Sequence, residues 1–546
     1  MKRKAVAAVL TAVMVASMFT GCGSDNGSSS AKSASAASAA SAANDTVDED
    51  GKVNGIMYQE GLPLVDEGDY TFSIFCDDSS ESGEFIMLDE FKKQTNVDVD
   101  LKIYPYETAT ERLNLDLNSG DYADVIGGWT LSDNAILTYG VNQGVFIPLE
   151  DYFEKYCPNI SAILDLPGVR EKMTAPDGHI YTIPYVCTDT TVGYSPYINT
   201  KWLENVGMSM PTTIDEFEAV LKAFKEQDAN GNGDASDEIP FSTDPNNKHI
   251  EAMAGYFGLP MNKLGIAIQN EKVVYGGVSD TYREFLSWFH KLYAEGLVDV
   301  ELYTQDSSTW EGKGNQDLYG VSIAYGSNEF TGIPAAEERG DFDSMPVLNT
   351  DKDGIWLRDT EGFSVYRTQA VITNKAEHPE IICRWFDNAF ALENGIGCNR
   401  GPVGVIVNKE DDGYHAIDTT TLSEEDQEKY SWGNLWPQSL PKYLPVDFEF
   451  VEEHPMYDEK KATEEAYEAN LTKEIIPSYW IDLDKIDTFS DTNTAIKDFF
   501  EQQQAQFVCG ELDIDNDADW QAYVDGMYSL GLEDWVATQG IEEIAK

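Results

Sequence analysis

The chain has 546 residues and a formal net charge of -60, from 97 Asp and Glu against 37 Lys and Arg. A chain of this length exceeds what one hydrophobic core supports, so we expect roughly two to four domains. The 42% apolar content excludes a wholly disordered chain, and the acidity argues against nucleic-acid binding, which needs clustered Lys and Arg.

The N-terminal segment is typical of an exported lipoprotein. Three basic residues precede the uncharged apolar stretch 5–19, which is shorter than the ~20 residues that span a bilayer as a helix. The sequence Phe-Thr-Gly-Cys then ends at Cys22 and resembles a bacterial lipobox, with Phe19 in the place of the usual Leu. We therefore predict a signal peptide over 1–21 and acylation of Cys22, for example by palmitate. The alternative is an ordinary signal peptide followed by an incidental cysteine.

The segment after Cys22 is rich in Ser, Ala and Asp and has almost no apolar side chain larger than Ala up to residue 52. Such a segment cannot bury enough surface to offset the entropy of ordering, so we predict a flexible tether over 22–60. Two or three acyl chains, at roughly 0.8 kcal/mol per buried methylene, would hold Cys22 on the membrane. This predicts a lipid-anchored protein on the extracellular side of the cell membrane, because no later stretch is apolar enough to span the bilayer.

Six further cysteines follow, which is too few for a disulfide scaffold, and none forms a Cys-x-x-Cys pair. We expect buried free thiols, although an exported protein could pair some of them. These cysteines are Cys76, Cys157, Cys187, Cys383, Cys398 and Cys509.

The first part of the folded body alternates between strand and helix patterns. Residues 70–76 and 97–103 alternate apolar and polar side chains, and 123–128 is a short apolar run that ends in glycines. Two segments with helical spacing separate these strands, 83–96 and 107–118. The order predicts a mainly parallel sheet with crossover helices, and such sheets bind ligands beyond the carboxyl ends of their strands. Trp129, directly after the glycines, is therefore a candidate ligand residue.

Further elements follow along the chain. Asp177-Gly178 predicts a turn before a β segment, and 318–325 has the pattern of a buried strand. The clearest helix covers 214–226, where Thr213 is the expected N-cap and Glu216 completes a capping box. Other helices are expected over 281–295, over 378–392 and around 520–530.

The loop directly after the 214–226 helix resembles a calcium-binding loop. Oxygen side chains occupy its positions 1, 3 and 5, and the glycine at position 6 allows the sharp turn that brings them around one point. Position 12 is Ile239 instead of the usual Glu, so two neighbouring carboxylates would close the shell. The candidate ligands of a structural calcium ion are Asp228, Asn230, Asn232, Asp234, Asp237 and Glu238. The alternative is a solvated Asn-Gly turn without metal.

The residues around this loop are specific enough to indicate a family. The sequence from Trp202 through 211–217 to the loop and the segment Asp237–Pro240 resembles extracellular solute-binding protein family 1. Within that family it is similar to the LipO-type, calcium-containing oligosaccharide-binding lipoproteins of ABC importers. The resemblance covers nearly all of residues 65–540.

The resemblance implies an α/β, periplasmic-binding-protein-like fold of type II, in which two hinged lobes close over a ligand cleft. On this basis we expect lobe 1 to comprise 65–188 and 318–370, and lobe 2 to comprise 189–317 and 371–546, with the calcium-like loop 228–238 in lobe 2. The implied partners are an oligosaccharide, two permease subunits with a cytoplasmic ATPase, and the membrane through the lipid anchor. The receptor itself is expected to be a monomer.

Carbohydrate sites combine aromatic faces, which cover the C–H surface of a sugar, with a few fixed hydrogen-bonding groups. The candidate sugar platforms are Trp129, Trp310, Trp432 and Trp436. Asn328 and Arg400, in polar loops, are candidate partners for sugar hydroxyls or a uronate. For each of these residues the alternative is ordinary core or surface packing.

Two other function classes remain open from the sequence. An exported glycoside hydrolase needs two carboxyl groups about 5–10 Å apart, but among 97 acidic residues such pairs carry no information. The chain has no G-x-S-x-G, no H-E-x-x-H and no phosphate-binding glycine loop, so we do not expect an enzyme. A surface glycan-binding lipoprotein that works without a transporter is the other alternative.

Overall fold

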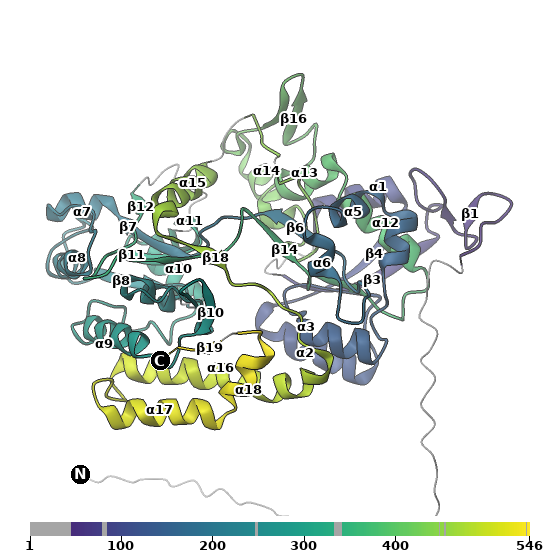
Figure 1. Cartoon of the computed structure of the whole chain (residues 1–546). Coiled ribbons are helices and arrows are strands. Elements are labelled where there is room, and N and C mark those ends of the chain that lie inside the picture. The colour runs from purple at the N-terminus through teal and green to yellow at the C-terminus, as the bar shows by residue number, and fades with distance from the viewer. Residues whose placement is uncertain are drawn as a thin grey trace, which may run out of the picture. The chain divides into compact units, whose positions relative to one another are not determined.

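The computed structural model describes residues 45–545 except 79–83, 246–248, 332–340, 447, 452–454 and 542 (Figure 1). The expected signal peptide, the acylation site Cys22 and most of the expected tether lie outside the described residues. The chain divides into two units, and all the described residues belong to the second, residues 39–546. None of the helices in this described part is long and apolar enough to cross a membrane.

The last residues of the expected tether form a short hairpin that packs on the body. β1 (Lys52–Val53) pairs antiparallel with β2 (Met57–Tyr58). Val53 and Met57 are buried in a hydrophobic core. The prediction of a tether up to residue 60 is therefore wrong at its carboxyl end, because isolated apolar residues give no periodic signal that predicts burial.

The first sheet contains the strands that the sequence predicts, in the order β15-β5-β3-β4. Its strand β3 (Tyr70–Asp77) pairs in parallel with β4 (Val97–Tyr104) and β5 (Val125–Gly127). An edge strand from far later in the chain, β15 (Ala370–Ile372), pairs antiparallel with β5. The crossover helices are α1 (Ile86–Thr95) and α2 (Tyr106–Ser119). The expected α/β architecture with a mainly parallel sheet is confirmed.

A helix and a loop from distant segments of the chain complete the core of this sheet. Trp385 packs edge-on against Phe72 of β3, with ring centroids 5.3 Å apart, and stacks on Trp436 at 5.6 Å. All three side chains are buried. Besides α1 and α2, the helices of this lobe include α3 (Asp133–Ala135), α4 (Glu150–Tyr156), α5 (Pro158–Leu164), α6 (Val169–Met173), α12 (Pro379–Ala389), α13 (Leu392–Arg400) and the π-helix Ile136–Asn142.

The second sheet has the order β12-β7-β11-β8 and a core of its own. β11 (Tyr319–Ala324) lies between β7 (Ser195–Asn199), to which it is antiparallel, and β8 (Ile239–Thr243), to which it is parallel. The edge strand β12 (Phe342–Ser344) pairs with β7. The expected assignment of 318–370 to lobe 1 is therefore wrong for β11 and β12, because their backbone hydrogen bonds bind them to the second sheet.

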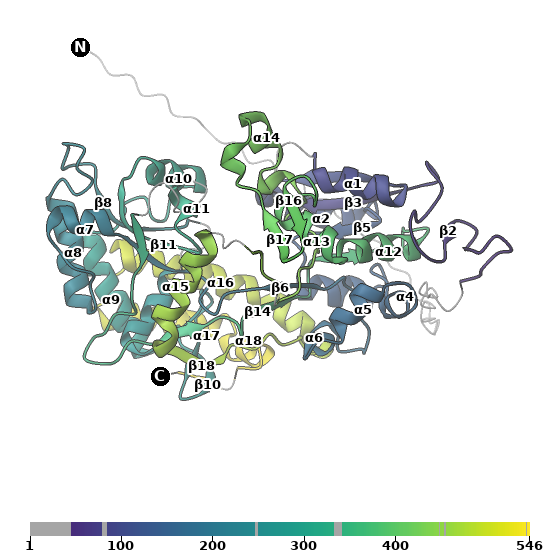
Figure 2. The same ribbon diagram turned by 90° about the horizontal axis from the view of Figure 1, so that it is seen from above.

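The expected assignment of 371–546 to lobe 2 also needs correction. Residues as late as Leu440 pack in the first core, whereas Tyr467 and the C-terminal helices pack in the second. Both views show α16 (Ile486–Cys509) beside α9 (Asp280–Ala294) (Figures 1 and 2). Hydrophobic patterns identify these elements but carry no signal about the sheet that each one joins.

The other elements of the second lobe are α7 (Thr200–Val206), the 3-10 helix η3 (Ile250–Phe257), β9 (Ile266–Gln269), β10 (Lys272–Tyr275), α10 (Ser307–Asn315), α11 (Asn328–Thr331), β13 (Trp356–Arg358), α15 (Pro455–Tyr467), β18 (Leu471–Ile475), α17 (Asp517–Ser529), α18 (Leu532–Thr538) and β19 (Glu543–Ile544).

Two antiparallel strands, β6 (Tyr185–Thr188) and β14 (Phe363–Tyr366), carry the chain from one lobe to the other and back. The Asp189 carboxylate, just after β6, accepts hydrogen bonds from the Ser364 hydroxyl at 2.6 Å and the Tyr366 hydroxyl at 3.1 Å. These bonds tie the two crossing strands together at the point where the chain leaves the first lobe.

All six cysteines in the described part of the chain are free thiols. Four are buried as expected, whereas Cys187 is half-buried and Cys509 is exposed. Burial raises the pKa of the Cys187 thiol to about 12, so this side chain is an uncharged, weakly reactive group at neutral pH.

Helix α8 (Ile214–Glu226) allows a test of its predicted cap. The Thr213 hydroxyl accepts a hydrogen bond from the Glu216 amide at 3.2 Å, and the Glu216 carboxylate accepts one from the Thr212 amide at 2.9 Å. We expect Thr213→Ala to lower the free energy of unfolding by about 1 kcal/mol in urea denaturation, because an amide at the helix start loses its partner. Thr213→Ser keeps the hydroxyl and should match the wild type. Equal stability of the Ala variant would contradict the role of the cap.

Candidate functional site

Trp129 follows the carboxyl end of β5, beside the end of β3. The Asp77 carboxylate, the last residue of β3, accepts hydrogen bonds from the Trp129 amide at 2.9 Å and the Thr130 amide at 2.6 Å. Gly128, directly before Trp129, has a φ of +132°, and a Cβ at this position would lie 2.2 Å from Asp77 Oδ1. Only glycine allows this close approach. The turn therefore fixes the backbone of Trp129 while 45% of the residue stays exposed.

Three tyrosines gather near Trp129, two of them from the crossing strands. The Trp129 ring contacts Tyr366 of β14 edge to face, with centroids 5.4 Å apart, and lies 6.4 Å from Tyr185 of β6. Tyr106, the first residue of α2, is 40% exposed. Burial and the nearby Asp78 raise the pKa of the Tyr106 hydroxyl, which therefore stays a hydrogen-bond donor. An exposed indole with hydroxyls around it can cover the apolar face of a sugar and bind its polar groups.

A loop that follows α14 (Glu424–Lys429) fixes Trp432 to the same end of β3. The Gln438 amide donates to the Asp78 carboxylate at 2.7 Å, and the Gln438 side chain donates to the Trp432 carbonyl at 2.8 Å. Lys442 Nζ donates to Gln438 Oε1 at 2.5 Å and lies 5.5 Å from the centre of the Trp432 ring. Burial lowers the pKa of Lys442 to about 8. Trp432 is 57% exposed, so a second indole is available on this side.

The passage from β6 into the second sheet is clamped by side chains of the second lobe. Lys460, in α15, donates from Nζ to the Gly193 carbonyl at 2.7 Å and lies 3.7 Å from the centre of the Tyr325 ring. The Asp359 carboxylate accepts from the Gly193 amide at 2.7 Å. Burial raises the pKa of Asp359 to about 6 and lowers that of Lys460 to about 8. Lys460 and Asp359 therefore fix both backbone polar groups of Gly193, its carbonyl and its amide.

Two of the four candidate tryptophans lie in hydrophobic cores instead of at a binding surface. Trp310 of α10 is 3% exposed and packs with its ring 5.7 Å from that of Phe330. Trp436 is fully buried against Trp385. Their interpretation as sugar platforms is corrected, because neither ring offers a free face. The polar sequence around Trp310 conceals its burial, since it is the one large apolar side chain of a short helix.

Asn328 begins α11, and Arg400 ends α13 with its guanidinium carbon 6.0 Å from the centre of the Phe450 ring. Their roles toward sugar hydroxyls or a uronate stay predictions. Sequence reasoning missed Tyr185 and Tyr366. Their place beside Trp129 depends on which distant segments pair, and no local pattern reports that pairing.

The calcium-like loop 228–238 is closed by hydrogen bonds from its own backbone. The Asp228 carboxylate accepts from the Gly233 amide at 3.0 Å. The Glu238 carboxylate accepts from the Ala229 amide at 2.9 Å, which joins the two ends of the loop. The first and last candidate ligands are thereby brought to one side of the loop.

Each of these two carboxylates also has a buried oxygen that no hydrogen bond satisfies, Asp228 Oδ1 and Glu238 Oε2. Burial raises the pKa of Glu238, and the charge of Asp237 adds to this effect. Unsatisfied buried carboxylate oxygens are costly unless a cation or proton compensates them. The donor set is oxygen only, which suits Ca²⁺. The residues present therefore fit a calcium ion.

The other candidate ligands of this loop bond among themselves. The side-chain amides of Asn230 and Asn232 donate to the Asp237 carboxylate at 3.3 Å and 2.8 Å. Asp234 accepts from the Ser236 hydroxyl at 2.6 Å, on the outer, exposed part of the loop. Their coordination of a cation stays a prediction.

Comparison with known proteins identifies relatives over most of the chain. Residues 78–395 match the family of bacterial extracellular solute-binding proteins. The fructooligosaccharide ABC transporter substrate-binding protein FusA of Streptococcus pneumoniae is 31% identical over 411 residues, which cover 73% of this chain and 70% of FusA. Lipoprotein LipO of Bacillus subtilis is 28% identical over 280 residues, 50% of this chain and 52% of LipO.

Solved structures share the fold. An EF-hand mutant of FusA in complex with fructo-nystose superposes with a TM-score of 0.75 and 27% identity, covering 86% of this chain and 98% of FusA. The HMO binding, ABC-transporter associated solute-binding protein of Bifidobacterium longum infantis has a TM-score of 0.70 and 21% identity, covering 87% of this chain and 98% of its own. The second likeness concerns the fold alone.

Proposed function

The chain belongs to the bacterial extracellular solute-binding proteins, and we propose that it is the oligosaccharide receptor of an ABC importer. One observation carries the sugar assignment: the exposed Trp129, held beyond the carboxyl ends of β3 and β5 with Tyr185 and Tyr366 around its ring. This combination of an aromatic face and hydroxyls suits a sugar. Trp432 is the second proposed platform. The relatives are substrate-binding proteins, so we assign a binding function without catalysis.

The first ligands that we propose are neutral oligosaccharides that contain fructose. FusA is named for fructooligosaccharides and is similar over most of this chain. The Asp77 carboxylate binds the backbone amide of Trp129, and the Asp78 carboxylate binds the amide of Gln438, whose side chain donates to the Trp432 carbonyl. Negative charge at this position would disfavour a uronate.

Ligand capture would proceed by closure of the two lobes about the crossing strands. The ties from Asp189 to β14 and the clamp on Gly193 both hold the crossing on the second-lobe side of β6, so we place the bending in β6 and β14 themselves. A ligand shifts an open–closed equilibrium by its differential affinity for the closed state. Trp129 and Tyr366 would supply that difference, since one belongs to the first lobe and the other to the crossing.

We also propose that an acylated Cys22 holds the receptor on the extracellular face of the cell membrane. There it would deliver sugar, as a monomer, to two permease subunits driven by a cytoplasmic ATPase. The leader sequence and the lipoprotein relative LipO support this location.

Loop 228–238 is the proposed calcium site. Asp228 and Glu238 would be its main ligands, with Asn230, Asn232, Asp234 and Asp237 completing the shell. Calcium there would supply charge compensation and would brace the junction between α8 and β8. The EF-hand of FusA supports the assignment.

Calorimetry of the folded protein against a panel of glycans tests the receptor function. The panel contains kestose, which FusA binds in a solved structure, other neutral oligosaccharides and an oligogalacturonate. We expect at least one neutral oligosaccharide to bind with a Kd in the micromolar range or lower and to be recovered intact. Failure to bind any member of the panel would refute the proposal, and release of shorter products would indicate a glycoside hydrolase instead.

A further inference from the structure

A second group of potential metal ligands lies on a hairpin outside the calcium-like loop. β16 (Val407–Glu410) pairs antiparallel with β17 (Gly413–Ala416). The register places Glu410 opposite the residue two before His415. Diagonal neighbours of this kind share one face of a hairpin, and their side chains can meet.

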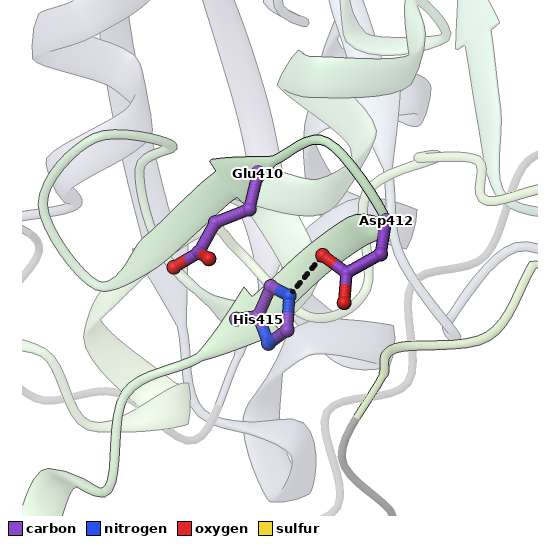
Figure 3. A group of neighbouring side chains, drawn as sticks. All are labelled: Glu410, Asp412 and His415. Carbon is purple, nitrogen blue, oxygen red and sulfur yellow. Dashed lines mark hydrogen bonds and ion pairs between the residues drawn. The ribbon is translucent and has the colours of Figure 1, made fainter.

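The turn of the hairpin adds a third ligand to this face. The Asp412 carboxylate and His415 Nε2 are 2.9 Å apart, and the His415 ring lies between the carboxylates of Asp412 and Glu410 (Figure 3). One ligand atom from each of the three residues lies within 4.8 Å of the other two. In the described part of the chain no other group of three His, Cys, Asp or Glu residues meets this condition.

The opposite face of the hairpin is anchored to the body. Lys409 Nζ and the Tyr414 hydroxyl both donate to the Glu393 carboxylate, at 2.7 Å and 3.3 Å. The Val451 amide adds a backbone bond to the Tyr414 carbonyl at 3.0 Å. These bonds fix the hairpin to the body. They also keep Lys409 on the face opposite the three potential ligands, where it binds Glu393.

The carboxylate charge on the ligand face is only partly balanced, because Asp412 bonds to His415 but Glu410 does not. Residues 410–412 are three consecutive acids, and among the described residues the Glu410 carboxylate has no hydrogen bond or ion pair. His415 contributes a charge only when it is protonated. A bound dication would satisfy both carboxylates at once and would use the neutral imidazole as a ligand.

We propose that Glu410, Asp412 and His415 bind a zinc ion, with water in the fourth position. An imidazole nitrogen with two carboxylate oxygens is a donor set that zinc accepts, whereas calcium takes 6–8 oxygens. Zinc bonds of about 2.0–2.2 Å require the three side chains to close by about an ångström, which exposed rotamers permit. The site is distinct from the calcium-like loop in chemistry and in place.

Calorimetric titration of the folded protein with zinc chloride, in excess calcium, tests this site. We expect one zinc ion per chain with micromolar affinity, and about tenfold or greater weakening in His415→Gln. Glu410→Gln should also weaken binding by about tenfold, although it leaves the bond between Asp412 and His415 intact. This second variant separates loss of a ligand from loss of hairpin structure.

His179→Gln is the matched control. His179 also pairs with a carboxylate, that of Glu150 at 2.5 Å, but no third ligand joins them in the described structure. Its variant should bind zinc as the wild type does, and the exposed thiol of Cys509 is the same in all variants. Absence of zinc binding by the wild type, or wild-type affinity in both His415→Gln and Glu410→Gln, would overturn the proposal.

Discussion

Replacing Trp129 by Ala is expected to weaken oligosaccharide binding more than any other single change at the aromatic site. A central, well-held aromatic residue typically contributes about 2–3 kcal/mol to binding, which is roughly 30–150-fold in Kd. The Asp77 bonds to the backbone at 129 and 130 do not depend on the indole, so the empty position would keep its shape. Calorimetry with the best ligand of the glycan panel measures the change.

Two controls separate the loss of a sugar platform from damage to the fold. Tyr528→Ala removes an aromatic side chain of similar exposure, 43%, from α17 and should leave Kd unchanged. Trp129→Phe keeps an aromatic face and should retain part of the affinity. Wild-type affinity in Trp129→Ala, at an unchanged melting temperature, would show that the sugar binds elsewhere.

The predictable part of the fold is the part whose signal is local. β3, β4 and β5 alternate with helices over a short stretch, and a crossover helix makes neighbouring strands parallel. β11 is different, because a strand that is buried along its whole length carries no information about its partners. Its neighbours β7 and β8 lie far earlier in the chain, and only the folded sheet reveals that it belongs to the second lobe.

The same distinction applies to the sites. The position of Trp129 at the sheet edge is predictable because it directly follows the end of a strand, and the closed form of the calcium-like loop is predictable because its candidate ligands lie within one short segment. Tyr366 joins Trp129 only through the pairing of β14 with β6. Trp310 misleads because a polar sequence surrounds a ring that the tertiary structure buries. His415 and Glu410 become neighbours only once the hairpin register is known.

Removal of calcium is the second change for which we expect a large effect. A ligand that binds only the folded state at 100 times its Kd contributes about 2.7 kcal/mol of stability. For a lobe of this size such a loss corresponds to a decrease in melting temperature of about 5–10 °C. Addition of a chelator should produce this decrease in the wild type, and restoring calcium should reverse it.

Variants at the two unsatisfied carboxylates assign this effect to the loop. In Asp228→Asn and Glu238→Gln the melting temperature should respond little to chelator, because each variant removes a charged ligand. Glu226→Gln, which changes an exposed carboxylate at the end of the preceding helix, should respond as the wild type does. Equal chelator sensitivity in all three variants would place the calcium elsewhere. A wild-type melting temperature that does not change with chelator would refute the site.

The pH dependence of the same measurement tests Glu238 in particular. Burial raises the pKa of Glu238 in the folded state above the ordinary 4.5. In the metal-free protein, stability is therefore lost as the pH rises from 4.5 through the folded pKa and the carboxyl ionises. Calcium compensates the ionised form and binds poorly to the protonated one. The difference in melting temperature between calcium and chelator should therefore widen as the pH rises from 4.5 to neutrality. A difference that stays constant over this range would mean that Glu238 is not a ligand, because calcium competes with the proton for a ligand carboxylate whose pKa is raised above 4.5.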